Sequence, residues 1–131
     1  IERDGAILLV GPEAGPLALP EAPIDQANDP AALRGFLLRD IGLPTHVGFV
    51  YSVYENRATG RNHIVYRCDA GHGTPSRGRF VPLAEVPLDR IADGPTRDVV
   101  RRFAAESALG NFSVYFGNEA KGRTHSLGRK A

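Results

Sequence analysis

The segment spanning residues 45–68 constrains the fold more than any other part of the chain. Its apolar residues alternate with polar ones on both sides of residues 56–61, which are rich in turn-forming types. Alternation with a period of two places successive side chains on opposite faces of a strand. Two such strands joined by a turn predict a long β-hairpin, so the chain must build a β-sheet.

Two segments carry the signals of helices. Asn28 or Asp29 is a suitable N-cap, apolar residues then recur at helical spacing, and Gly42 ends the pattern, which predicts a helix over residues 30–41. A second helix is expected over residues 95–109. Further strand regions are expected at residues 6–10, 16–19, 79–82, 112–116 and 123–127.

This order of elements predicts a single α+β domain over residues 1–131 with a mixed sheet. The chain is 42% hydrophobic and 24% charged, as soluble globular domains are. No apolar run approaches the about 20 residues of a membrane span, and no signal sequence is present, so we expect a cytoplasmic protein without a membrane partner. A net charge of +1 gives no argument for a nucleic-acid partner.

Residue content adds two constraints. Cys68 is the single cysteine, which excludes an intrachain disulfide framework and a cysteine-based zinc site. The chain contains no methionine and begins with Ile1, from which we expect a truncated N-terminus.

The helix that ends in Ile41-Gly42-Leu43-Pro44, followed by the long hairpin, resembles the Nudix hydrolase superfamily, the MutT-like proteins. The resemblance lies in the order of strands and helices and covers most of the chain. It implies an α/β/α sandwich with a mixed sheet, two main helices and long hairpins. It also implies hydrolysis of nucleoside diphosphate-linked compounds, with Mg²⁺ or Mn²⁺ held by glutamates of the Nudix box.

The Nudix box itself is degenerate. With Gly42 and Leu43 as anchors, Phe36 and Arg39 stand at positions where the family has glutamates, and Asp40 is a conservative substitute. A divalent ion that activates water on a diphosphate needs several carboxylates, and an arginine nearby opposes cation binding. Asp40 is therefore the catalytic candidate. The candidate metal ligands are Asp40 together with Glu21 and Asp25 of the preceding loop.

Four basic residues are candidates for binding a small phosphate-containing ligand. His63 and Arg67 are predicted to share one face of a hairpin strand, where they would meet an anion in a Nudix-like cleft. Arg77 and Arg79 lie in a glycine-rich loop that has the composition of a lid over a phosphate. The alternatives are an exposed polar sheet face and a plain connecting loop.

Two functions follow from these observations. One is a divergent Nudix hydrolase with a weakened or relocated metal site. The alternative is a non-catalytic Nudix-like module that binds a nucleotide, another small ligand or a protein partner, a second copy of the chain included. A third interpretation assigns metal-free chemistry to His63, His72 or His125.

Overall fold

A computed structural model describes the backbone of residues 1–56, 60–110, 112–118 and 123–130, and side chains within residues 1–55 and 60–110. These described residues form seven strands and two α-helices, with short 3₁₀ segments at Leu83–Glu85 and Leu88–Arg90. The helices are α1 (Pro30–Ile41) and α2 (Gly94–Leu109). The strands are β1 (Glu2–Arg3), β2 (Ala6–Leu9), β3 (Thr45–Asn56), β4 (Arg61–Ala70), β5 (Arg79–Pro82), β6 (Phe112–Asn118) and β7 (Arg123–Lys130).

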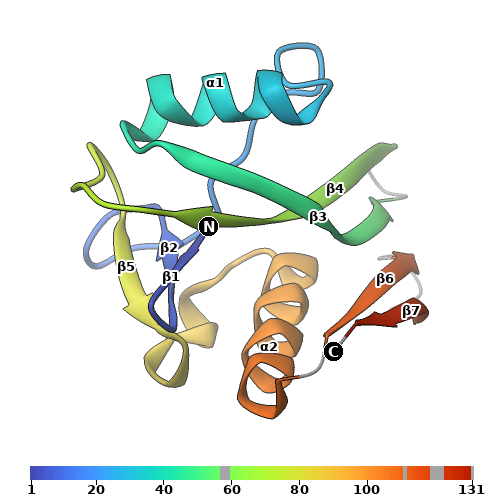
Figure 1. The fold of residues 1–131 in the computed structure, drawn as a ribbon. Helices are drawn as coiled ribbons and strands as arrows, with labels where there is room; N and C mark the ends of the chain where they lie inside the picture. Colours follow the sequence, from blue (N-terminus) through green and yellow to red (C-terminus); the bar gives the residue numbers. More distant parts are fainter. Residues whose placement is uncertain (57–59, 111, 119–122, 131) are drawn as a thin grey trace.

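All seven strands belong to one mixed sheet in the order β5-β2-β1-β4-β3-β6-β7. β3 and β4 form the predicted antiparallel hairpin, whereas β1 runs parallel to β4 and β6 runs parallel to β3. α1 covers one face of this sheet and α2 covers the other, so the fold has three layers (Figure 1). The predicted α+β fold with a mixed sheet is confirmed.

Both helices end where the sequence predicts, within a residue. Asp29 caps α1 by accepting a hydrogen bond from the Ala32 backbone at 2.7 Å, and Asp93 caps α2 in the same way. Gly42 ends α1 at a φ of +79°, a left-handed conformation that glycine adopts without a steric penalty. Local capping chemistry therefore accounts for both helix boundaries.

The core lies on both faces of the sheet. In β2, Leu8 packs with Leu37 and Ile41 on the α1 side, whereas its neighbour Leu9 packs with Val100 on the α2 side. Successive residues of a strand point to opposite faces, so a strand covered on both sides is apolar at every position. The sandwich explains why residues 6–10 form an unbroken apolar run.

The β3–β4 hairpin contains two irregularities that the alternating pattern does not predict. The register shifts between Val47 and Val50 and again between Val50 and Ser52. A Cβ at Gly48 would lie 2.7 Å from the Arg67 carbonyl oxygen, so a side chain at this position cannot be accommodated without a shift. As a result Tyr51 and Tyr54, three residues apart, both pack on the α2 side with Val99.

Two further features differ from the sequence prediction. Residues 16–19 form isolated bridges to Val10 and Ile91 and not a strand. The two-residue strand β1 is too short to produce a periodic pattern, and the sequence gives no sign of it. In the described part of the chain, no helix is long and apolar enough to cross a bilayer.

Candidate functional site

A small pocket lies between the sheet and α2. It has a volume of about 50 Å³, and its apolar wall includes Ile7, Leu19, Val65, Val99, Val100 and Phe103. A single water needs roughly 10–15 Å³ of such space, so the pocket has room for a few water molecules or a small organic group. The hairpin, β1, β2 and the segment around Leu19 line it on one side, and the inward face of α2 lines it on the other.

Arg67 of β4 and Glu2 of β1 bring charge to this apolar pocket. The guanidinium donates from Nε and Nη2 to the two carboxylate oxygens of Glu2, at 2.6 and 2.9 Å. This hydrogen-bonded pairing raises the pKa of Arg67. Glu2 is paired with Asp69 across the parallel β1–β4 contact, two residues beyond Arg67, so both side chains lie on the same face of the sheet.

Two aromatic rings flank the Arg67 guanidinium. Its central carbon lies 5.4 Å from the centre of the Phe103 ring on α2 and 5.9 Å from that of Phe49 on β3. A guanidinium within about 6 Å of an aromatic face is attracted by the ring quadrupole. The side chain of Arg67 is only 24% exposed, so its charge is held close to the pocket and largely away from water.

Tyr51 joins the hairpin to α2 at the same place. Its ring meets Phe103 edge-on at 5.5 Å, and its hydroxyl donates a hydrogen bond to the Glu106 carboxylate. Phe103 and Glu106 are three residues apart on one side of α2, which allows Tyr51 to contact both. The pocket is thus bounded by side chains whose positions are fixed by contacts between sheet and helix.

Cys68 also lines the pocket but is poorly suited to act as a nucleophile. The residue is 4% exposed, and burial raises the pKa of its thiol. A buried thiol with a raised pKa supplies little thiolate, the reactive form, at neutral pH.

The opposite face of the sheet holds the region where the family resemblance places a metal. Asp40, near the end of α1, forms a two-pronged ion pair with Arg77, with Nη2–Oδ2 at 2.6 Å and Nε–Oδ1 at 3.3 Å. The neighbouring Ser76 donates its backbone N–H to the Ile41 carbonyl at 2.6 Å. An arginine side chain therefore neutralises the carboxylate that was expected to contact a cation.

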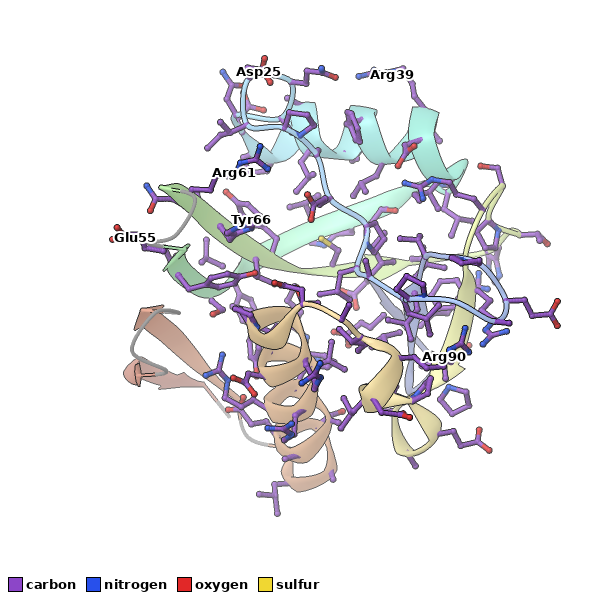
Figure 2. All side chains as sticks on the ribbon, turned by 180° about the vertical axis from the view of Figure 1, so that it is seen from behind. Asp25, Arg39, Glu55, Arg61, Tyr66 and Arg90 are labelled. Carbon is purple, nitrogen blue, oxygen red and sulfur yellow. The ribbon has the colours of Figure 1, made fainter. Side chains whose placement is uncertain are left out.

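The other predicted metal ligands lie away from Asp40. Glu21 and Asp25 are exposed in the segment before α1, and Figure 2 shows Asp25 on the loop at one end of the helix, with Arg39 towards the other end. Within the described residues, no three His, Cys, Asp or Glu side chains gather where they could hold a metal ion. This arrangement does not fit Mg²⁺ or Mn²⁺.

The four basic candidates for ligand binding do not converge on one site. His63 stacks on Tyr54 at 4.7 Å and lies on the α2 side of β4, as does Arg67, but four residues of strand separate them by about 13 Å. Arg77 is paired with Asp40 near the end of α1, and Arg79 is exposed at the start of β5. Of these four candidates, Arg67 alone lines the pocket between the sheet and α2.

The histidines of the metal-free alternative are also dispersed. His72 is exposed in the loop after β4, whereas His63 lies near the start of that strand. His125 belongs to β7, and its side chain lies outside the described residues.

Three residues at the pocket were not singled out from the sequence: Glu2, Tyr51 and Phe103. Phe103 carries a weak signal, since it falls on the apolar stripe of α2. Glu2 carries none, because its role depends on the pairing of β1 with β4, whose partners are more than sixty residues apart. Tyr51 reaches α2 through the register shifts of β3.

Comparisons with known proteins identify relatives of this chain. Over 130 residues, 99% of the chain, it is 38% identical to a protein of Rhizobium meliloti (strain 1021) named "Probable flavin reductase", of which it covers 41%. Over 79 residues, 60% of the chain, it is 28% identical to the reductase component of the flavin-dependent trigonelline monooxygenase of Acinetobacter baylyi, of which it covers 26%. The chain therefore spans less than half the length of both relatives.

Among solved structures, a Nudix hydrolase from Nitrosomonas europaea superimposes with a TM-score of 0.73 at 17% sequence identity. The match covers 89% of this chain and 73% of that one. No family model matches the sequence. The chain accordingly has the predicted Nudix-like fold, and at this identity the likeness extends to the fold alone.

The expected hydrolase function is wrong. Of the two relatives by sequence, one is named a probable flavin reductase and the other the reductase component of a flavin-dependent monooxygenase, and these names point away from a Nudix hydrolase. The expected dependence on Mg²⁺ or Mn²⁺ is wrong for the same reason, since reductases of this type suggest flavin and nicotinamide nucleotides in place of a divalent ion.

Proposed function

We propose that this chain acts in flavin reduction, in which a reduced nicotinamide nucleotide gives a hydride, and solvent a proton, to a flavin. The observation that carries the proposal is the 38% identity to a flavin reductase over 99% of the chain. A likeness that runs through the whole fold, and not through one motif, favours a shared role for the whole chain.

Within such a reductase we assign this chain a supporting role. A pocket of about 50 Å³ does not enclose the three fused rings of a flavin or a whole nicotinamide nucleotide. The Rhizobium meliloti relative is more than twice as long as the part that this chain matches, which leaves other regions to hold the flavin. We therefore propose that the pocket of this chain receives a smaller ligand that acts on the reductase.

The name of the second relative supports the proposal that a partner protein receives the reduced flavin. That relative is named the reductase component of a monooxygenase, and a reductase that stands apart from its monooxygenase must hand the reduced flavin on. We accordingly propose a separate flavin-dependent oxygenase as the partner of this protein.

The test measures NADH and NADPH oxidation at 340 nm under anaerobic conditions, with FMN, FAD or riboflavin as acceptor. It compares the natural gene product that carries this sequence with the 131-residue chain alone. We expect reduction by the gene product and little or no turnover by the chain alone, because the enclosed part of its pocket is smaller than the three fused rings of a flavin. A gene product that reduces none of the three flavins would contradict the proposal.

A further inference from the structure

The pocket on the α2 side of the sheet combines an apolar interior with a guanidinium at its edge. Val65, Val99 and Phe103 supply apolar surface, and Arg67 supplies the cationic side chain of the lining. A site of this composition favours a ligand that is apolar at one end and anionic at the other.

Arg67 is arranged to hold a carboxylate. It already binds one in two-pronged geometry, that of Glu2, with the donor atoms Nε and Nη2 directed at the two oxygens. The planar fork of arginine matches the two oxygens of a carboxylate, and this match is lost with lysine. Phe49 and Phe103 keep the guanidinium in place beside the pocket.

We propose that the pocket binds a compact organic monocarboxylate, whose apolar end enters beside Val65 and Phe103 and whose carboxylate takes the place of Glu2 on Arg67. The inference deepens the proposed function and rests on it, because it names the chemical class of the smaller ligand. No charge is left unpaired by the exchange, since Glu2 is already 21% exposed and reaches water when it is released.

The volume limits the size of the ligand. A cavity of about 150 Å³ encloses a benzene ring, whereas this pocket offers about 50 Å³. A short branched alkyl group is therefore enclosed, and a ring enters by one edge with the rest in the open mouth.

The first experiment is a titration of the ¹⁵N-labelled chain, followed by NMR. The probes are isobutyrate and benzoate, and the matched neutral probes are isobutyramide and benzamide. We expect the acids to shift the amide signals of Val65, Val99 and Phe103, with at least tenfold weaker binding of the amides. Absence of any shift with both acids, or equal binding of acid and amide, overturns the inference.

Variants of Arg67 and of Glu2 should change the affinity for the acids in opposite directions. Arg67→Gln should weaken binding of the acids at least tenfold, and Arg101→Gln, which removes the same charge from the exposed side of α2, should leave it unchanged. Glu2→Gln should strengthen binding, because it removes the competing carboxylate. A Glu2→Gln variant that weakens binding as Arg67→Gln does would show that the pair only supports the pocket, and would overturn the inference.

Two further measurements keep the result interpretable. If Arg67→Gln does not fold, Arg67→Lys is used, which retains the charge and removes the fork; it should weaken binding severalfold, and unchanged binding counts against the inference. The flavin assay is read separately. An active reductase that binds neither acid refutes the carboxylate site alone, whereas acid binding without flavin reduction refutes the proposed function alone.

Discussion

Replacing Tyr51 by phenylalanine tests the contact that joins the hairpin to α2. The Tyr51 hydroxyl donates to the Glu106 carboxylate, and the ring, 2% exposed, packs against Phe103. The substitution removes the hydroxyl and keeps the ring, so the buried apolar area is almost unchanged. Its cost therefore reports on the hydrogen bond.

The magnitude follows from the surroundings of the acceptor. A hydrogen bond to a charged group contributes about 1.5–3 kcal/mol to stability. Glu106 is half-buried, so water replaces part of the lost bond, and we expect the free energy of unfolding to fall by about 1–1.5 kcal/mol. For a chain of 131 residues this corresponds to a fall in Tm of about 3–7 °C.

The assay is urea unfolding followed by circular dichroism. Tyr66→Phe serves as the control, since the Tyr66 hydroxyl makes no hydrogen bond to the described residues, and it should cost less than about 0.5 kcal/mol. Glu106→Ala and the double variant complete a cycle with a coupling energy of about 1 kcal/mol. The reasoning fails if Tyr51→Phe costs no more than the control, or if the two single effects add.

Three other changes have defined outcomes. Gly48→Ala places a methyl group 2.7 Å from the Arg67 carbonyl oxygen and should lower the free energy of unfolding by about 1–3 kcal/mol, measured by urea unfolding. Its control is Gly71→Ala, which should be nearly neutral because the added methyl group meets open space. Cys68 should react with iodoacetamide at pH 8 at least tenfold more slowly in the native than in the unfolded chain, because burial raises its pKa above the usual value of about 8.5; equal rates would contradict its burial. Asp40→Asn breaks a pair whose side chains are 29% and 48% exposed, so it should cost less than about 1 kcal/mol, and Mg²⁺ should leave the Tm of either protein unchanged.

Local chemistry made most of the fold predictable. The caps Asp29 and Asp93, the glycine after each helix and the alternation in the hairpin act over a few residues, and the corresponding elements occur at the predicted places. Contacts that depend on distant pairing were not predictable. The parallel contact of β1 with β4 and the register shifts of β3 leave no local pattern, yet they bring Glu2 and Tyr51 to the pocket.

The candidate site was only partly accessible from the sequence for the same reason. Arg67 could be named as an anion-binding candidate because strand alternation places it on a defined face, and that role stays a prediction. Its separation from Arg77 and Arg79 could not be foreseen, since Arg79 lies on the edge strand β5 and Arg77 in the loop before it, whereas Arg67 lies on the central strand β4. The hydrolase prediction failed because fold and function are separable: the layout of a Nudix protein was correctly recognised, and its chemistry did not follow.

The clamp between Asp40, Ser76 and Arg77 has a mechanical consequence. Hydrogen bonds from both the backbone and the side chains attach the end of α1 to the loop between β4 and β5. The end of α1 therefore cannot move away from this loop without breaking these hydrogen bonds. On the other side of the sheet, α2 is held by side-chain hydrogen bonds, from Arg97 to the Leu88 and Ile91 carbonyl oxygens and from the Tyr51 hydroxyl to Glu106, so a ligand that displaces α2 has to rearrange these bonds.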